Sequence, residues 1–487
     1  MSITRHLARH GAGRPDAPAL TCEGESLTYG ALAALVQRIA ARFQDAPEGG
    51  IALDLPNGAA LAVLFLAAAH AGREGQVLDP SWPAGQRADI LARIRPGLLV
   101  SCGADADVRL SPAQGLEGLA EAVGAGAGAM VAPPDPDLPF YVGFTSGSTG
   151  LPKGYRRTHR SWTASFDADT HEFGIGPGDV LLAPGALTHS LFLYALARGL
   201  DAGAHVILAK SFRPRAVADL ARRHKASVLY GVPTQLALLL DHLAAEGATL
   251  DGIRLVLCSG AKWPAGRKAL LSHHLPEAGF AEFYGASELS FITVAKGGEA
   301  VPEGSVGRAF DGVTLAIRDK AGRRLPAGRT GLVFVDSPFL FQDYATGDSP
   351  DLMRHGREIS VGDMGRIDAA GFLTLAGRAK RMIVTSGKNL YPEEVERQLE
   401  LHPAIAAAAV MGVPDGKRGE RLVAFVLPEE GAQVTRVDLV AWLRPRLALF
   451  KVPRLYARVS RWPLTASGKT DFAAVARLWP HGCELIP

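Results

Sequence analysis

The sequence predicts an α/β protein with a large N-terminal domain of stacked, mostly parallel α/β subdomains, a β-rich subdomain, and a small α+β C-terminal domain. Three observations lead to this prediction. The chain has 487 residues and is 47% hydrophobic, enough for more than one core. Short apolar strands alternate with helical patterns over residues 28–101. A charged segment near residue 380 then precedes a compact stretch of about a hundred residues.

Hydrophobic periodicity assigns the first elements. Apolar residues at helical spacing predict an amphipathic helix over residues 28–43. The stretches 51–55 and 98–101 are short strand candidates, and residues 59–71 form an apolar helix between them, a pattern typical of a parallel sheet. Further along, residues 304–335 alternate short strands with turns, which predicts the β-rich subdomain.

The domain boundary is predicted where Gly377-Arg-Ala-Lys-Arg381 interrupts the apolar pattern. Boundaries fall in exposed, polar linkers that few contacts cross. The sequence therefore predicts an N-terminal domain over residues 1–379 and a C-terminal domain over residues 380–487.

Charge and cysteine content narrow the function. The 52 basic residues are scattered among 49 acidic ones, so no basic stripe predicts nucleic-acid binding. The four cysteines lie far apart without metal-binding spacing, which is typical of thiols in a reducing compartment. The longest apolar run, Leu61–Ala69, is too short to span a bilayer. We expect a cytoplasmic protein without a nucleic-acid partner or membrane insertion.

The segment Thr145-Ser-Gly-Ser-Thr-Gly-Leu-Pro-Lys-Gly154 carries the strongest chemical signal. It holds four hydroxyls, three glycines and one lysine, so backbone N–H groups, hydroxyls and a cation can converge on one anion. An apolar strand, Phe140–Phe144, leads into it, and ligand-binding loops of α/β proteins follow strand carboxyl ends. The sequence therefore predicts a phosphate-binding loop here.

Two other nucleotide-binding patterns fail. A Walker loop needs Gly-Lys-Ser/Thr, whereas Lys153 is followed by Gly154, and Ser467–Thr470 has a proline at position 463 where that motif needs glycine. Residues 124–129 match a dinucleotide pattern, but no strand leads into them and a proline-rich stretch follows. We interpret residues 124–129 as a loop.

Beyond the phosphate loop, three apolar strands each end in a break of small or polar residues. They cover residues 226–230, 255–258 and 282–284, and a helix follows the first two. Since the carboxyl ends of parallel strands meet at one edge of a sheet, these breaks are expected to line one crevice.

Together with Tyr284-Gly-Ala-Ser-Glu288, Val361-Gly-Asp363, Gly377-Arg378 and Ser467-Gly-Lys469, the phosphate loop resembles the adenylate-forming superfamily of acyl-CoA synthetases, peptide-synthetase adenylation domains and luciferases. The resemblance covers nearly the whole chain, with five motifs in the same order. It implies that ATP, Mg²⁺ and coenzyme A take part, and that the C-terminal domain is mobile.

The resemblance also implies roles for the nucleotide-site residues. The β- and γ-phosphates would be bound by Thr145, Ser146, Ser148, Thr149 and Lys153. Glu288 would ligate Mg²⁺, a hard cation that takes carboxylate and phosphate oxygens. Tyr284 would pack on the adenine, and Ser287, where the family usually has threonine, keeps a hydroxyl for the α-phosphate. Asp363 and Arg378 match the ribose-binding pair.

Three positions of the predicted C-terminal domain match residues of the same family. Lys469 would bridge the acyl carboxylate and the phosphate, offsetting the repulsion between two anions. Lys380 stands at the hinge between half-reactions. Gly387 would approach the pantetheine tunnel of the thiol acceptor, where the missing side chain leaves room.

The acyl site is predicted around residues 189–286. His189 stands where relatives place an aromatic residue or histidine near the acyl group, with a structural, hydrogen-bonded histidine as the alternative. The expected apolar lining is Leu191, Phe192, Val232, Pro233, Gly285 and Ala286. Lys262 is either a reader of a second substrate carboxylate or a solvated lysine.

The sequence as a whole therefore predicts an ATP-dependent carboxylic acid:CoA ligase that forms an acyl-adenylate, releases pyrophosphate and makes a thioester. Its expected catalytic residues are Lys469, Thr145, Lys153, Glu288 and His189. One alternative passes the acyl group to the phosphopantetheine of an acyl carrier protein. Another is a non-catalytic or adenylate-only relative, which the complete set of motifs disfavours.

Overall fold

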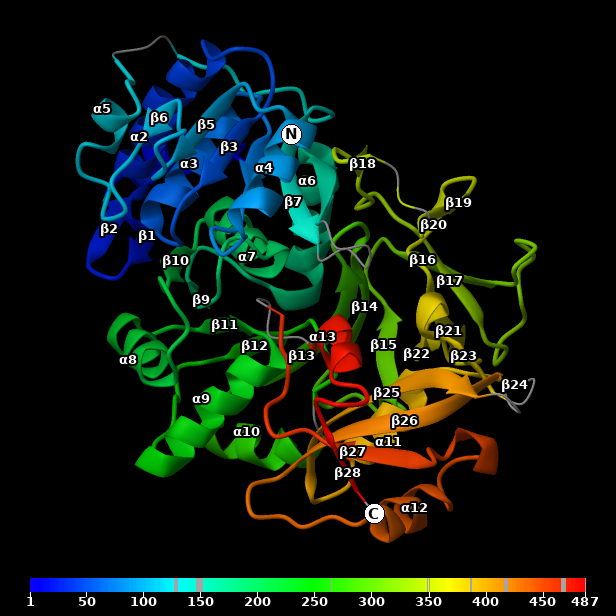
Figure 1. Ribbon diagram of the computed structural model, residues 1–487. Helices are drawn as coiled ribbons and strands as arrows, with labels where there is room; N and C mark the ends of the chain where they lie inside the picture. Colours follow the sequence, from blue (N-terminus) through cyan, green and yellow to red (C-terminus); the bar gives the residue numbers. More distant parts are fainter. Residues whose placement is uncertain are drawn as a thin grey trace.

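The computed structural model of the chain contains three β-sheets with helices packed between and around them (Figure 1). It describes residues 1–126, 130–145, 152–263, 265–347, 349, 351–385, 388–415, 419–465 and 470–486. Two sheets belong to the N-terminal part of the chain and the third to its C-terminal part.

The smaller N-terminal sheet has the order β18-β8-β7-β4-β3-β5-β6. Its strands are β3 (Ile51–Asp54), β4 (Gly75–Val77), β5 (Leu98–Ser101), β6 (Val108–Arg109), β7 (Pro139–Thr145), β8 (Lys153–Thr158) and β18 (Asp343–Tyr344). The strands from β7 to β6 run parallel, and β8 turns back antiparallel to β7. The carboxyl end of β7 therefore opens directly into the predicted phosphate loop.

The larger sheet has a parallel half and an antiparallel half. The parallel half holds β1 (Pro18–Cys22), β10 (His205–Leu208), β9 (Val180–Ala183), β11 (Val228–Gly231), β12 (Leu255–Cys258) and β13 (Gly279–Ala286), with β2 (Glu25–Thr28) antiparallel at its edge. The antiparallel half holds β14 (Ser290–Lys296), β15 (Ser305–Ala309), β16 (Thr314–Arg318), β17 (Gly331–Asp336), β19 (Met353–His355), β20 (Glu358–Ser360), β21 (Asp363–Ile367) and β22 (Phe372–Arg378). This second half contains the β-rich subdomain predicted over residues 304–335 and extends beyond it at both ends.

Helices precede, connect and cover the strands of the two N-terminal sheets. They are α1 (Leu7–Gly13), α2 (Tyr29–Gln44), α3 (Ala59–His70), α4 (Ala84–Ile94), α5 (Leu119–Ala122), α6 (His159–Phe173), α7 (Ser190–Ala202), α8 (Pro214–His224), α9 (Pro233–Glu246), η1 (Ala265–Arg267) and α10 (Lys268–His274). The side chains of Thr28 and Thr158 accept hydrogen bonds from the first turns of α2 and α6. Helices α6, α7 and α9 end on left-handed glycines.

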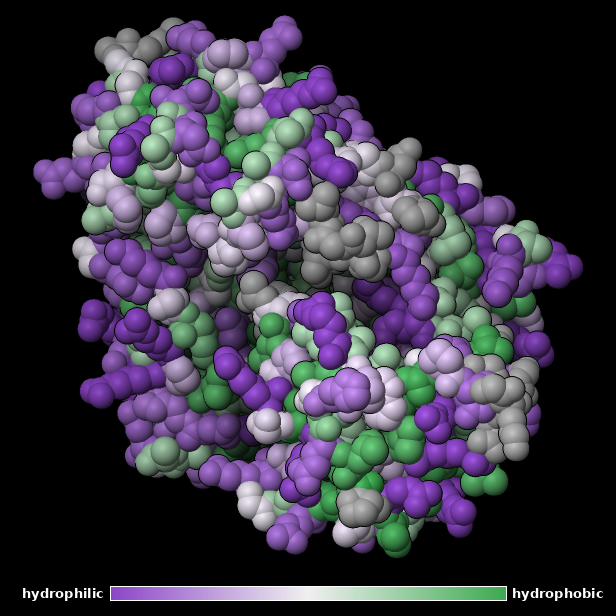
Figure 2. Space-filling model, in the orientation of Figure 1, coloured by the Kyte–Doolittle hydropathy of each residue, from purple (hydrophilic) through white to green (hydrophobic). Residues whose placement is uncertain are grey.

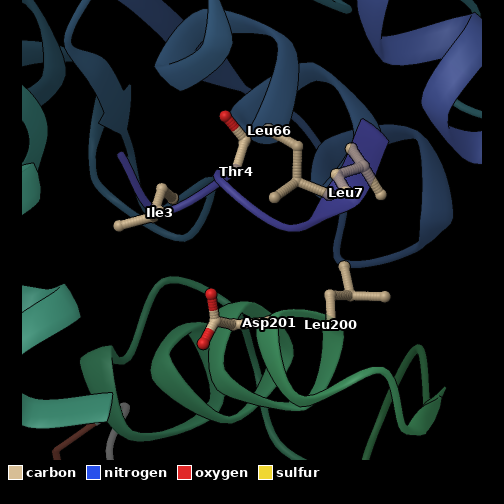
Figure 3. Close-up of a pocket in the computed structure, with 6 residues that line it drawn as sticks. All are labelled: Ile3, Thr4, Leu7, Leu66, Leu200 and Asp201. Atoms are coloured by element: carbon tan, nitrogen blue, oxygen red, sulfur yellow. The ribbon is translucent and has the colours of Figure 1, made fainter. Parts of the chain in front are cut away.

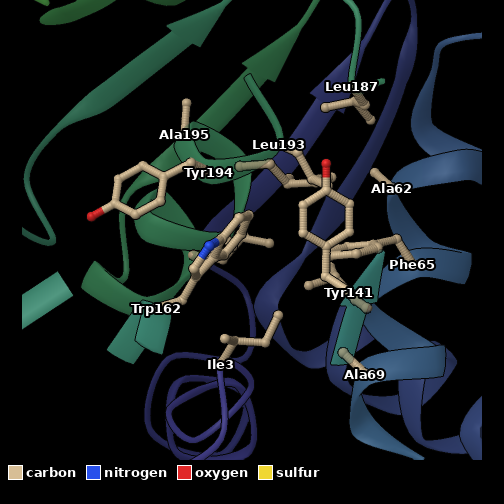
Figure 4. Packing of buried hydrophobic residues seen from close by; sticks show 14 of the residues in the cluster. Ile3, Ala62, Phe65, Ala69, Tyr141, Trp162, Leu187, Leu193, Tyr194 and Ala195 are labelled. Atoms are coloured by element: carbon tan, nitrogen blue, oxygen red, sulfur yellow. The ribbon is translucent and has the colours of Figure 1, made fainter. Parts of the chain in front are cut away.

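The main hydrophobic core joins the two N-terminal sheets. Helix α3 is buried on nearly every side, as its continuous apolar sequence predicts. Around it, Phe65 and Tyr141 meet edge to face at 5.7 Å, and Trp162 packs against Tyr194 at 5.4 Å (Figure 4). A second cluster, under α8, α9 and α10, covers the other face of the larger sheet.

Buried histidines make this core sensitive to acid. His159 stacks on Phe140 at 4.8 Å, and its Nδ1 accepts a hydrogen bond from the Ile3 N–H. Burial lowers the pKa of His159 to about 3 and that of His205 to about 4. Burial also lowers the pKa of His10 and His70. All four residues are therefore neutral in the folded chain at pH 7.

We expect the free energy of unfolding to fall as the pH drops from 7 to 5. Below pH 6.5 these histidines become protonated in the unfolded chain but stay neutral in the folded chain. Their contribution to the free energy of unfolding is therefore complete above pH 6.5 and declines as the pH falls towards their pKa in the folded state. Each such histidine contributes up to about 1.4 kcal/mol per pH unit. Urea unfolding at pH 7, 6 and 5 measures this slope, and His159→Gln should make it shallower. An unchanged slope in that variant would exclude His159 as a source.

The C-terminal sheet has its own core. Its strands are β23 (Ile383–Thr385), β24 (Lys388–Leu390), β25 (Ile405–Asp415), β26 (Gly419–Pro428), β27 (Leu455–Arg458) and β28 (Glu484–Leu485). The helices are η2 (Ala379–Arg381), α11 (Pro392–Glu400), α12 (Arg436–Leu443), η3 (Leu449–Lys451) and α13 (Phe472–Arg477). Two hydrophobic clusters lie entirely within this part of the chain. The predicted fold class, with a separate α+β unit at the C-terminus, is confirmed.

Contacts between the two parts are mostly polar. Arg397 of α11 donates to the carbonyl of Leu375 on β22 at 3.1 Å, and the carboxylate of Glu393 accepts from the Arg378 N–H at 3.4 Å. In Figure 1 the C-terminal sheet, coloured orange and red, lies beside β15 and β22. Interfaces of this polar kind are typical of domains that move relative to each other.

The structure corrects one expected strand. Strand β13 is longer than the predicted 282–284 and includes Gly285 and Ala286, because its antiparallel ladder with β14 continues to Ser290. A Cβ at position 285 would lie 2.3 Å from the Ser290 carbonyl oxygen, so only glycine permits this approach. Among the described residues, no helix is both long enough and apolar enough to cross a membrane.

Candidate active site

The predicted nucleotide-binding residues come from four places in the fold. They lie at the β7–β8 hairpin, at the turn after β13, at the start of β21 and at the end of β22. In the view of Figure 2, the surface is hollowed between the N-terminal subdomains and the C-terminal domain. Five predicted site residues, Ser146, Ser148, Thr149, Gly387 and Lys469, lie outside the described part of the chain.

The β7–β8 hairpin presents the two ends of the predicted phosphate loop. Thr145, the last residue of β7, pairs with Lys153, the first residue of β8. The Lys153 ammonium donates to Ser349 Oγ at 2.6 Å and to Asp351 Oδ2 at 2.9 Å. Its side chain is 19% exposed. This ammonium is half-buried and already paired with a carboxylate. A phosphate oxygen could replace that carboxylate as its partner.

Asp351 also holds the predicted hinge residue. The Lys380 ammonium lies 2.5 Å from Asp351 Oδ2, the same oxygen that Lys153 approaches. Burial disfavours the ionised carboxyl, but the hydrogen bonds from Lys380 and Lys153 outweigh it and lower the pKa of Asp351. One ionised carboxylate therefore connects the phosphate-loop lysine with the hinge lysine, a contact that the sequence motifs do not indicate.

Glu288 occupies the turn between β13 and β14. Its side chain is largely buried, and Oε1 accepts a hydrogen bond from the Tyr344 hydroxyl at 2.8 Å. Within the described ranges, no cluster of three or more histidine, cysteine or acidic side chains could cage a metal ion. A single carboxylate of this kind fits Mg²⁺, which is usually held by one or two carboxylates together with substrate phosphates.

The predicted adenosine-binding residues meet across the larger sheet. Asp363 and Arg378 pair in the β21–β22 ladder, and Arg378 Nε lies 3.2 Å from Asp363 Oδ1. The Tyr284 hydroxyl donates to Asp363 Oδ2. Burial and the neighbouring Asp363 carboxylate raise the pKa of Tyr284 well above 10, so this hydroxyl stays a donor. The fold thus brings together three residues that are distant in the sequence.

The predicted acyl-site residues lie near the edge of the main core. His189 is the residue that precedes α7, and Val232 takes the same position before α9. Phe192 is buried, and its ring fills the space that a side chain at Gly185 would need. Leu191 and Ala286 pack against the core from its edge. The predicted acyl-site residues therefore lie at the starts of α7 and α9 and at the end of β13.

Lys262 has an internal partner. Its ammonium donates to Glu282 Oε2 at 2.6 Å and to the Ser305 carbonyl at 2.8 Å. Glu282 also accepts from the Trp263 N–H, so it anchors the segment after β12. The contacts of Lys262 therefore favour a structural role over the reading of a second substrate carboxylate.

Two cavities lie away from these residues. The first, of about 10 Å³, is lined by Ile3, Thr4, Leu7, Leu66, Leu200 and Asp201 and could hold about one water molecule (Figure 3). This cavity lies at the carboxyl end of α7, whereas His189 precedes the amino end of the same helix. The second, of about 290 Å³, opens where β4 and β7 begin, between Glu74 and Pro139, at the opposite end of β7 from Thr145.

Comparison with known proteins identifies the family of the chain. Residues 7–345 match the family described as AMP-binding enzyme, and residues 394–469 match the AMP-binding enzyme C-terminal domain. The chain is 36% identical to the uncharacterized acyl-CoA ligase YhfT of Bacillus subtilis (strain 168) over 96% of both chains. It is 31% identical to feruloyl-CoA synthase of an Amycolatopsis species, over 93% of this chain and 94% of that enzyme.

Among solved structures, ATP-bound MatB from Rhodopseudomonas palustris superposes with a TM-score of 0.87 at 26% identity, covering 99% of both chains. The fold and these family matches thus define an adenylate-forming enzyme. The chain belongs to the AMP-binding enzyme family, among the acyl-CoA synthetases, which are AMP-forming acid–thiol ligases.

Proposed function

We propose that the chain is an ATP- and Mg²⁺-dependent carboxylic acid:CoA ligase that works through an acyl-adenylate. The observation that carries the proposal is the placement of Lys153, Glu288 and the Tyr284–Asp363–Arg378 group at neighbouring element ends. Each supplies one contact that ATP needs: a cation for phosphate, a carboxylate for Mg²⁺ and a carboxylate for ribose hydroxyls.

In the first half-reaction, a carboxylate oxygen of the acid attacks the α-phosphorus and pyrophosphate leaves. Such transfers depend on positioned cations and donors more than on an activated nucleophile. We assign Thr145, Ser146, Ser148, Thr149 and Lys153 to the leaving pyrophosphate. Mg²⁺, held by Glu288, would neutralise charge on the phosphates.

The remaining residues orient the two reactants. Ser287 would donate its hydroxyl to the α-phosphate, and Lys469 would lie between the phosphate and the acyl carboxylate. Tyr284 and Asp363 would hold the adenosine. The acyl chain would enter the apolar region near His189, Phe192, Val232 and Ala286, whose side chains suit an aliphatic or aryl acid.

In the second half-reaction, the thiol attacks the acyl carbon and AMP leaves. We propose that the domains 1–379 and 380–487 rotate about Lys380 between the two steps, and that Gly387 then approaches the thiol arm. The polar contacts between the two parts support this proposal, since few apolar groups would have to separate.

A screen of carboxylic acids with ATP, Mg²⁺ and hydroxylamine tests adenylation, because hydroxylamine traps acyl-adenylates as hydroxamates. Repeating it with coenzyme A or a holo acyl carrier protein identifies the acceptor. We expect hydroxamate with at least one acid and thioester with coenzyme A. Thioester with the carrier protein alone would favour the carrier-protein alternative, and failure of every acid would refute the enzyme proposal.

Lys380→Pro is expected to leave adenylation within about twofold and to slow thioester formation by at least about tenfold. Proline fixes φ near −65° and restricts the residue before it, so it hinders rotation at the hinge. Lys380→Gln is the matched control, because it removes the ion pair with Asp351 but leaves the backbone free. Stopped-flow measurement of both half-reactions checks this. If the two variants behave alike, the ion pair and not the hinge is responsible.

A further inference from the structure

One face of strand β8 connects the phosphate loop with the Ser287–Glu288 turn. Side chains alternate along a strand, so Lys153, Tyr155 and Arg157 point to the same side of β8. Lys153 holds the ion pair described above, and the Tyr155 hydroxyl lies beside the side chains of Ser190 and Ser287. Arg157, at the third position, contacts the turn itself.

Arg157 is a buried cation with an unusual set of partners. Its side chain is 1% exposed, and Nη1 donates to the carbonyls of Ser287 at 3.2 Å and Glu288 at 3.3 Å. Among the described residues, its Nε and Nη2 have no hydrogen-bond partner. Burial lowers the pKa of Arg157 to about 10, so it remains a cation at neutral pH, favoured by nearby Tyr155 and Glu288.

Arg198 is a second buried arginine of the N-terminal part of the chain and serves as a comparison. It is equally buried, but its Nε pairs with Asp169 at 2.6 Å, and Nη2 donates to Thr170 and to the Ile175 carbonyl. No carboxylate in the described chain forms an ion pair of this kind with Arg157. A buried charge without a paired carboxylate lowers the stability of the fold. If position 157 were needed only for packing, an apolar residue would fill it at less cost.

The surroundings of Tyr155 show that the β8 face is closely built. The hydroxyls of Tyr155 and Tyr141 lie 3.0 Å apart. A Cβ at Gly143 would lie 2.2 Å from both of them, so this hydroxyl pair fills the space that a side chain at position 143 would need. The polar layer under Ser287 and Glu288 therefore has little freedom to rearrange.

We propose that Arg157 is a positioning residue of the nucleotide site, which fixes the peptide carbonyls of Ser287 and Glu288. The Ser287–Glu288 turn would then present one fixed geometry to the phosphates that the proposed function assigns to Thr145 and Lys153. The inference rests on the proposed function, because it assigns Glu288 to Mg²⁺. Two hydrogen bonds from one buried guanidinium nitrogen restrict the conformations open to the turn.

The test is calorimetric binding of an ATP analogue with a methylene group between the α- and β-phosphates, with Mg²⁺ and with EDTA. The readout is the Mg²⁺-dependent gain in affinity, the ratio of the two dissociation constants. In Arg157→Gln we expect this gain to fall about tenfold, since the turn loses hydrogen bonds from a charged donor. In Arg157→Lys, whose ammonium can still donate to carbonyls, we expect a loss of about threefold.

The direction in which the Mg²⁺-dependent gain changes distinguishes a positioning role of Arg157 from an effect of its charge alone. If Arg157 acted only by its charge, removing it would strengthen the binding of Mg²⁺ beside Glu288, and the gain would rise in Arg157→Gln. That result, or an unchanged gain in folded variants, would overturn the proposal. An equal loss with Mg²⁺ and with EDTA would also overturn it, because it would indicate a general structural defect. If Arg157→Gln does not fold, Arg157→Lys decides by the same criteria.

Arg198→Gln combined with Asp169→Asn is the matched control. It removes the other buried arginine together with its charge partner, and it should lower the melting temperature while leaving the Mg²⁺-dependent gain unchanged. A wild-type chain that does not bind the analogue, or binds it equally with and without Mg²⁺, would instead contradict the proposed function itself.

Discussion

Lys469→Ala is expected to slow acyl-adenylate formation by about 10²–10³-fold and thioester formation from a supplied acyl-adenylate by less than about threefold. The first step brings a carboxylate against a phosphate, and a positioned cation stabilises the transition state. Removing one preorganised group of this kind costs about 10²–10³ in rate. Once the adenylate exists, the two anions are already joined. Pyrophosphate release and thioester formation from purified acyl-adenylate measure the two rates separately.

Lys451→Ala is the control for this experiment. Lys451 belongs to the same predicted domain and pairs with Glu394 at 2.6 Å, so its loss removes a lysine without touching the proposed reaction. Partly exposed pairs contribute at most about 1 kcal/mol, and both rates should stay within about twofold. Equal losses of both half-reactions in Lys469→Ala would contradict the proposed alternation of the C-terminal domain.

Asp363→Asn is expected to lower kcat/KM for ATP by about 100-fold. Asparagine keeps the shape of the side chain but loses the charge that would accept two ribose hydroxyls and that holds Tyr284 and Arg378. Hydrogen bonds to a charged group contribute about 1.5–3 kcal/mol each, and 1.4 kcal/mol corresponds to tenfold. Pyrophosphate release at saturating acid, over a range of ATP concentrations, gives the value.

Asp343→Asn provides the comparison. Asp343 pairs with Arg156 at 2.6 Å, but its side chain is half exposed and lies on the edge strand β18. Its replacement should leave kcat/KM for ATP nearly unchanged. If Asp363→Asn also leaves kcat/KM for ATP unchanged, Asp363 does not bind the ribose, and the assignment of the adenosine site fails.

The regular elements were predictable because each is defined by a short stretch of sequence. The helical spacing over residues 28–43 corresponds to α2, and the apolar runs at 51–55 and 98–101 correspond to β3 and β5. The extension of β13 to Ala286 was not predicted, because Gly285 and Ala286 have the composition of a turn. Their strand conformation comes from pairing with β14, a partner that local composition does not reveal.

The candidate site was predictable to the extent that it consists of contiguous motifs. Tyr284, Asp363 and Arg378 were assigned from three such motifs, and the fold places them in contact. Asp351 and Arg157 belong to no motif and were missed. Their contacts reach Lys153, Lys380 and the Ser287–Glu288 turn, residues that approach them only in the folded chain.

The sequence by itself determined the fold class, the family and the residue types for phosphate, metal and ribose, because these depend on local pattern and on side-chain chemistry. Only the tertiary structure decided which of these residues share a partner. It joined Lys153 and Lys380 through Asp351, and it placed the buried cation of Arg157 against the carbonyls of the Ser287–Glu288 turn. Ion pairing and burial depend on distances between distant segments, and those distances exist only after the sheets have packed.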